Sequence, residues 1–154
     1  MIQDINIDID RCNNIIEENN YLEMVIAIEE LRDKYRGCIK SIDEDNSHVV
    51  WNYKKEDLIN IKEKLICHRE DLIFEKKQKD INEKIDEFRL YIENSSISNK
   101  DDLFKIIKDI EIINQKESTL EEKYHEIKNY LKLAHEFHRE TSLYILELIL
   151  LVIK

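Results

Sequence analysis

Histidine side chains bind metals and transfer protons near neutral pH, so their spacing is considered first. His135 and His138 lie three residues apart in the string HEFHRE, without the four-residue separation of the HExxH zinc helix. Glu122 and His125 have the Glu-x-x-His spacing of carboxylate-bridged metal bundles, which need a second such pair facing the first. The sequence contains no second pair. We therefore expect no metal or cofactor, and a metal-dependent enzyme that uses His125, His135 and His138 stays an alternative.

Other catalytic patterns are also missing from the sequence. Helical nucleases of the HEPN type place a histidine shortly after an arginine, and none of the six arginines is followed closely by one. Cys67 and His68 are adjacent, so on a helix they would point about 100° apart and would not form a thiolate pair. One glycine and no GK[ST] string exclude a Walker phosphate loop. These patterns predict that the protein is not an enzyme.

Acidic and aromatic residues around 38–52 are the strongest candidates for binding. Asp43, Glu44 and Asp45 lack the D-x-[DN]-x-[DN]-G pattern of a calcium loop, so we expect them in solvent. Trp51 and Tyr53 either anchor a partner or fold back to close the end of the helical bundle. The candidate partner-binding residues are Glu29, Glu30, Asp43, Glu44, Asp45, Trp51 and Tyr53.

The charge of the chain narrows the class of partner. Acidic residues outnumber basic ones by 34 to 24, which gives a net charge of -10. The excess is concentrated in residues 1–52, which hold 12 acidic and 5 basic side chains. Direct nucleic-acid binding is not expected, because contact with phosphates requires a basic surface. A basic protein partner fits this charge distribution.

Neither a membrane span nor a disulfide framework is predicted. The most apolar stretch is 143–153, where Glu147 is the only charge, and it is shorter than the roughly 18–20 residues that cross a bilayer. Cys12, Cys38 and Cys67 are odd in number and widely spaced, and no secretory signal opens the chain. Reduced thiols in the cytoplasm are therefore expected.

Composition and periodicity predict an all-α fold. The 154 residues contain no proline and one glycine, whereas sheet proteins need turn residues at every hairpin. Isoleucine is abundant, but its spacing is helical, and one face of residues 2–18 carries Ile2, Ile5, Ile9, Cys12 and Ile16. We predict a single domain over 1–154, a bundle of six or seven helices. Its parts are a helical hairpin (1–37), an irregular acidic and aromatic loop (38–52), a long or broken helix (53–93) and three C-terminal helices (99–154).

Start and stop signals mark several of these helices. Gly37 stands where a left-handed C-terminal cap is expected. Ser98 with Asp101, and Ser118 with Glu121, have the spacing of capping boxes at helix starts. The polar run 76–80 leaves open whether 53–93 is one helix or two.

The apolar stretch 143–153 is predicted to be the central helix around which the others pack. Glu140, Tyr144, Glu147 and Lys154 form a narrow polar seam along it. We expect this seam to reach solvent; the alternative is a buried carboxylate held by arginine or tyrosine, which would mark a site.

Two stretches carry a resemblance to known proteins. The first is KYRG (34–37) with DLINIKEKL (57–65), and the second is KYHEIKNYL (123–131) followed by ILELIL (145–150). They resemble a recurring type of small all-helical protein from low-GC Gram-positive bacteria and their phages, in which a proline stands where this chain has Glu147. The resemblance implies a helical fold over most of the chain. No activity is attached to that type, so it implies no site.

A non-enzymatic protein-interaction module is the function that these patterns favour. Immunity proteins, antitoxins and phage anti-defence inhibitors are often small and acidic, and many of their targets have basic grooves for nucleic acid. We therefore expect the chain to bind and neutralise a basic or nucleic-acid-binding protein. The alternative is a structural helical adaptor, or a homodimer in which the apolar tails of two copies pair.

Overall fold

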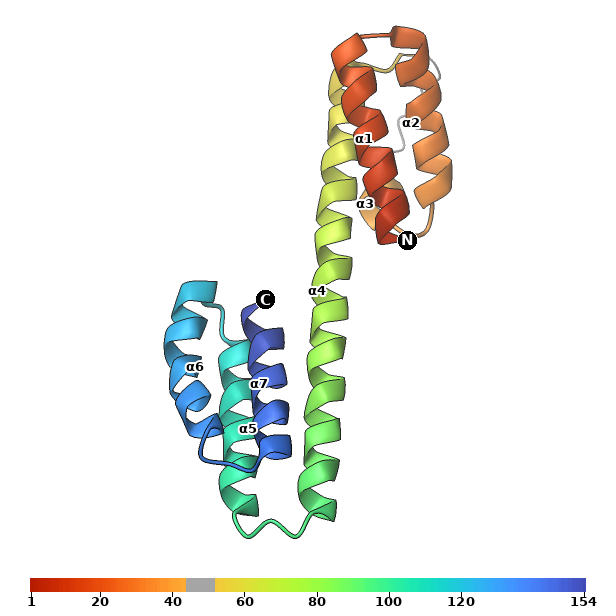
Figure 1. The fold of residues 1–154 in the computed structure, drawn as a ribbon. Helices are drawn as coiled ribbons and strands as arrows, with labels where there is room; N and C mark the ends of the chain where they lie inside the picture. The colour runs from red at the N-terminus through yellow and green to blue at the C-terminus, as the bar shows by residue number, and fades with distance from the viewer. Residues whose placement is uncertain (44–51) are drawn as a thin grey trace. The chain divides into compact units, whose positions relative to one another are not determined.

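The computed structural model describes residues 1–43 and 52–154, and over these ranges the chain forms seven helices and no strand (Figure 1). The predicted all-α class is therefore confirmed. The helices are α1 (Ile2–Glu18), α2 (Tyr21–Tyr35), α3 (Lys40–Asp43), α4 (Lys55–Asn94), α5 (Lys100–Gln115), α6 (Leu120–Ala134) and α7 (Arg139–Ile153).

The helices are divided between two compact units, Met1–Glu75 and Lys76–Lys154. The buried apolar side chains correspondingly form two clusters, one within residues 5–65 and the other within residues 81–152. The sequence predicted one core around the C-terminal helix, but α7 contributes to the second cluster alone. Helical periodicity shows that a helix buries one face, and it does not show which helices share a core.

In the first unit, α1 and α2 form the predicted antiparallel hairpin (Figure 1). The turn between them uses Asn19 in a left-handed conformation, with φ of 53°, and the side chain of Asn20 caps the start of α2. Gly37 follows α2 with φ of 74°, as its position predicted. The first half of α4 adds Leu58, Ile61 and Leu65 to the same core.

The stretch 38–52 was expected to be irregular throughout, and the structure corrects this. Residues 40–43 form the single turn α3 because Ile39 and Ile42 are both buried against the first core. The candidate residues Glu44, Asp45 and Trp51 lie outside the described residues.

The question left open for 53–93 is settled by α4, which is one continuous helix of 40 residues. The polar run 76–80 lies inside it. No proline or glycine occurs in the helix, so nothing in the backbone chemistry interrupts its hydrogen bonds.

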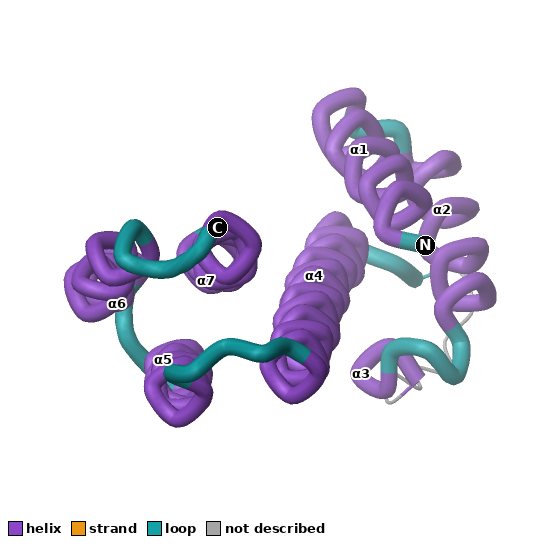
Figure 2. The backbone as a smooth tube through the Cα atoms, turned by 60° about the horizontal axis from the view of Figure 1, so that its bottom comes forward, coloured by secondary structure: helices purple, strands orange, loops and turns teal. Residues whose placement is uncertain are grey.

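The second unit is a bundle of α5, α6, α7 and the second half of α4 (Figure 2). α7 buries Ile145, Leu148, Ile149 and Val152 in it. Its seam reaches solvent as expected, because the side chain of Glu147 is half exposed and pairs with Lys84 at 2.8 Å. Hydrogen bonds to Glu147 and Glu87 raise the pKa of Lys84 to about 12. Tyr144, also in the seam, stacks on the buried Phe88 with ring centres 5.1 Å apart.

At the starts of α5 and α6, the N-cap residue lies one position after the predicted one. α6 begins at a capping box formed by Thr119 and Glu122, and not by Ser118 and Glu121. The string SxxE overlaps TxxE here, so the sequence offered two registers. At α5 the N-cap is Asn99, and Ser98 donates its hydroxyl hydrogen to the Asn99 side chain instead of capping the helix.

Two isoleucines on one helix test the position of the second core. Ile110 is fully buried in it, whereas Ile112 is 46% exposed. We expect Ile110→Ala to lower the free energy of unfolding by about 2–5 kcal/mol, because it leaves a cavity. Ile112→Ala should change it by less than about 1 kcal/mol. Denaturant unfolding of both variants measures the difference, and equal effects would contradict the described packing.

The register of the α6 cap is tested by a second pair of variants. Thr119 accepts a hydrogen bond from the backbone N–H of Glu122 at 3.2 Å, so Thr119→Ala should cost about 1 kcal/mol of stability. The buried Ser118 hydroxyl has no hydrogen-bond partner among the described residues, so Ser118→Ala should be close to neutral. Thermal unfolding distinguishes the two, and a larger loss for Ser118→Ala would place the cap at the predicted position.

Candidate functional site

The first unit carries an open groove of about 630 Å³ along the line where α1 and α2 meet. It is referred to below as the acidic groove, and it is lined by Ile7, Asp10, Arg11, Asn14, Ile15 and Glu18 of α1 and by Glu23 and Ile26 of α2. The unit that contains it holds 18 acidic and 10 basic residues, a net charge of -8. The remaining net charge of -2 belongs to the second unit.

Two isoleucines give the acidic groove an apolar surface. Ile7 is 60% exposed and Ile26 is 44% exposed, although each lies two residues from core positions of its own helix. Helical geometry explains this, because a step of two residues turns a side chain by about 200°, away from the buried face. Neither side chain belongs to the buried core cluster, and both are exposed to contact.

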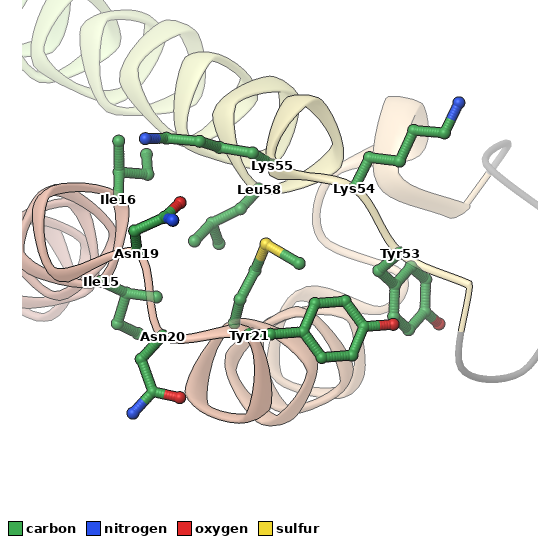
Figure 3. Close-up of a pocket in the computed structure, with 10 residues that line it drawn as sticks. Ile15, Ile16, Asn19, Asn20, Tyr21, Tyr53, Lys54, Lys55 and Leu58 are labelled. Atoms are coloured by element: carbon green, nitrogen blue, oxygen red, sulfur yellow. The ribbon is translucent and has the colours of Figure 1, made fainter.

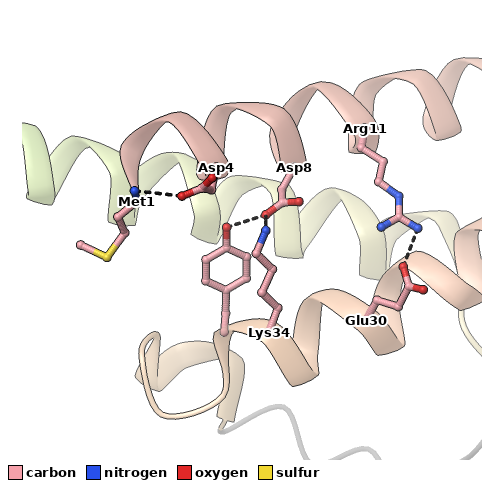
Figure 4. Close-up of polar contacts among 7 residues, drawn as sticks. Met1, Asp4, Asp8, Arg11, Glu30 and Lys34 are labelled. Carbon is pink, nitrogen blue, oxygen red and sulfur yellow. Dashed lines mark hydrogen bonds and ion pairs between the residues drawn. The ribbon is translucent and has the colours of Figure 1, made fainter.

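Carboxylates surround these isoleucines. The side-chain carboxylates of Asp10, Glu18 and Glu23 have neither a hydrogen bond nor an ion pair among the described residues. Arg11, the groove's basic residue, is paired with Glu30 of α2 at 2.6 Å (Figure 4). The positive charge of Arg11 is thereby largely neutralised, and the groove keeps a negative potential.

The buried carboxylate of Asp8 joins α1 to α2, the two helices that form the walls of the groove. Asp8 of α1 is buried, and its Oδ2 atom accepts hydrogen bonds from the Tyr35 hydroxyl and the Lys34 ammonium group, both at 2.6 Å. The contact with Lys34 is visible in Figure 4. Burial, together with the hydrogen bond to Asp8, raises the pKa of Tyr35 far above its usual range, so this hydroxyl stays a donor.

A second polar cluster joins α2 to the start of α4. Tyr53 is buried, and its hydroxyl donates to Glu29 and accepts from Nη1 of Arg32 at 3.0 Å. The Arg32 guanidinium also lies over the Tyr53 ring, 5.1 Å from its centre. Burial and the hydrogen bond to Glu29 raise the pKa of Tyr53. Tyr53 therefore closes this part of the first unit.

The structure thus places the predicted binding residues in different surroundings. Glu29 and Tyr53 contact each other directly, and Glu30 pairs with Arg11 at the edge of the acidic groove. Asp43 is the last residue of α3. Of the two roles weighed for Tyr53, the burial of its ring agrees with closure of the bundle.

Sequence reasoning missed the residues that form the groove. Ile7 and Ile26 stand off the apolar stripes of α1 and α2. An isoleucine off the core stripe on each of two consecutive helices, with acidic neighbours, was the signal that could have identified the surface.

A smaller hollow of about 200 Å³ lies at the end of the hairpin beside the start of α4 (Figure 3). Its described lining contains no histidine, cysteine or carboxylate, and consists of Ile15, Ile16, Asn19, Asn20, Tyr21, Met24, Tyr53, Lys54, Lys55 and Leu58. These side chains pack the turn between α1 and α2 beside the start of α4.

The three histidines considered for metal binding line neither the acidic groove nor the smaller hollow. His125 is exposed beside Lys128, while His135 ends α6 and His138 precedes α7. Within residues 1–43 and 52–154, no group of three or more His, Cys, Asp or Glu side chains is placed to hold a metal ion.

Comparison with protein-family models, with curated proteins and with solved structures found no significant match for this chain. In the part of the chain that the structure describes, no helix has the length and apolar character required to cross a membrane.

The cysteines of the first unit provide a test of its packing. Cys12 is buried in the first core, where burial and the nearby Asp8 carboxylate raise the pKa of its thiol to about 11, whereas Cys38 and Cys67 are exposed. At pH 8 roughly one Cys12 thiol in a thousand is ionised. A thiol reagent should therefore label two cysteines of the folded protein quickly, and the third only on unfolding. Rapid labelling of all three, counted by mass spectrometry, would contradict this packing.

Proposed function

We propose that the chain is a non-enzymatic protein-interaction module whose acidic groove binds a basic segment of a partner protein. The observation that carries the proposal is the pair of exposed isoleucines, Ile7 and Ile26, between carboxylates that lack ion-pair partners. Apolar side chains in the centre of a surface and charged ones at its rim are the usual anatomy of a protein interface.

The occupant that fits this groove is an amphipathic helix with lysines or arginines along its sides. Two antiparallel helices leave a straight groove between them, and helices bind such grooves through their apolar face. That face would cover Ile7 and Ile26. The flanking basic side chains would then reach the rim carboxylates Asp10, Glu18 and Glu23, and these new ion pairs would remove their unpaired charge.

A protein that uses such a basic helix to bind nucleic acid is the partner class that we propose. Its helix would already carry the charges that the groove requires, and occupation of the groove would block contact with phosphates. The net charge of -8 on the first unit would increase the rate of encounter with a basic protein. Binding would in this way neutralise the partner, as an immunity, antitoxin or anti-defence protein does.

Binding of a designed peptide tests the proposal without knowledge of the natural partner. The probe is a synthetic amphipathic helix with leucines on one face and lysines on its flanks, and its affinity is measured by calorimetry. Removal of three rim charges in Asp10→Asn/Glu18→Gln/Glu23→Gln should weaken binding about tenfold, at about 0.5 kcal/mol for each ion pair. The loss should shrink at high salt, because exposed ion pairs are screened.

A matched control removes three charges from the same unit away from the groove. Glu70, Asp71 and Glu75 of α4 are exposed and have no ion-pair partner among the described residues. The variant Glu70→Gln/Asp71→Asn/Glu75→Gln should bind the peptide as the unmodified chain does. Equal weakening by both triple variants, or equal binding of a peptide with glutamates in place of its lysines, would contradict a specific groove.

A further inference from the structure

We infer that the outer face of α7 is a homodimer interface, on which a second copy of this chain packs its own α7 in the antiparallel direction. The face is formed by Leu143, Leu146, Leu150 and Ile153, named here the α7 stripe. Leu143 is 48% exposed and Leu150 is 59% exposed, while the other two are partly buried at its edge.

The position of α7 in its bundle leaves this stripe uncovered by the helices of the second unit. The other three helices, α6, α5 and α4, form an arc around α7 that leaves one side of it open (Figure 2). They cover Ile145, Leu148, Ile149 and Val152, which point to the opposite side of the helix from Leu143 and Leu150.

The spacing of the stripe is that of a helix that packs against another helix. Its members follow one another at intervals of three, four and three residues, the pattern of a and d positions in a coiled coil. A partner surface must offer the same kind of stripe, and a second α7 does. Two-fold pairing of identical surfaces is also the most frequent way in which proteins form oligomers.

Charges at the two ends of α7 favour the antiparallel direction. Glu140 lies at the N-terminal end of the helix and Lys154 caps its C-terminal end. When Leu143 faces Leu150 of the second copy, Glu140 is level with that copy's Ile153, one residue from its Lys154. The central Glu147 is already paired with Lys84, so two copies of it can approach.

A hollow of about 400 Å³ beside the stripe fits the end of the second helix. It is lined by Lys84, Tyr91, Glu140, Leu143, Tyr144 and Glu147. Lys84 already pairs with Glu147 and lies over the Tyr144 ring, so Glu140 is the carboxylate of the hollow that a lysine of the second copy would bind. The antiparallel register brings Lys154 of the second copy to this hollow. The small net charge of the second unit, -2, also limits repulsion between copies.

Sedimentation equilibrium over a wide concentration range tests the inference on the full chain. The unmodified protein should form a dimer, and Leu143→Ser/Leu150→Ser should raise its dissociation constant at least about tenfold. The control Leu90→Ser/Ile112→Ser replaces two side chains of the same unit that are similarly exposed, and it should leave the dimer intact. A strict monomer, or equal effects of the two variants, would overturn the inference.

Charge exchange tests the direction of the helices and does not depend on the apolar variants folding. Glu140→Lys alone and Lys154→Glu alone should each weaken the dimer, and the combined variant should restore it. The two residues lie about 21 Å apart along one helix, so the rescue requires two chains. Failure of the combined variant to restore the dimer would overturn the antiparallel arrangement. The dimer does not depend on the acidic groove, so variants of the groove should leave it unchanged.

Discussion

Asp8 is buried between α1 and α2, and the form of the acidic groove depends on how its charge is satisfied. An unpaired carboxylate in a protein interior would be strongly destabilising. Tyr35 and Lys34 both reach its Oδ2 atom, and both come from the end of α2. Sliding α2 along α1 by one turn would break both hydrogen bonds. The carboxylate therefore selects one register of the hairpin, and in this register Ile7 and Ile26 line the same groove.

The acidic groove is a feature that folding does not require. The core of the first unit is formed by the apolar stripes of α1 and α2 together with residues of α3 and α4, and Ile7 and Ile26 do not belong to it. Asp10, Glu18 and Glu23 repel one another without local compensation, which lowers stability slightly. Departures from the arrangement that best stabilises a fold are expected at functional surfaces. A basic helix would relieve the repulsion and cover the exposed isoleucines in a single step.

The sequence predicted the helices well because each is specified by local spacing. The stripe through Ile5, Ile9 and Cys12 and the left-handed Gly37 both occur as expected. Features decided by contacts between distant residues were not predictable. The spacing of the apolar residues does not show that α1 and α7 bury their side chains in different cores. It also does not show that the Tyr53 hydroxyl donates a hydrogen bond to Glu29. At the start of α6, two overlapping capping patterns were equally good locally, and the helix uses the one that begins at Thr119.

Hydrogen–deuterium exchange of the full chain, with and without a basic amphipathic peptide, tests most directly whether α1 and α2 form a binding surface. A bound helix would shield and stabilise both walls of the acidic groove, so their backbone amides should exchange more slowly. The predicted result is added protection concentrated in residues 7–30, with α5 and α6 unchanged. Protection confined to residues 76–154, or spread evenly over both units, would contradict the proposed role of the acidic groove.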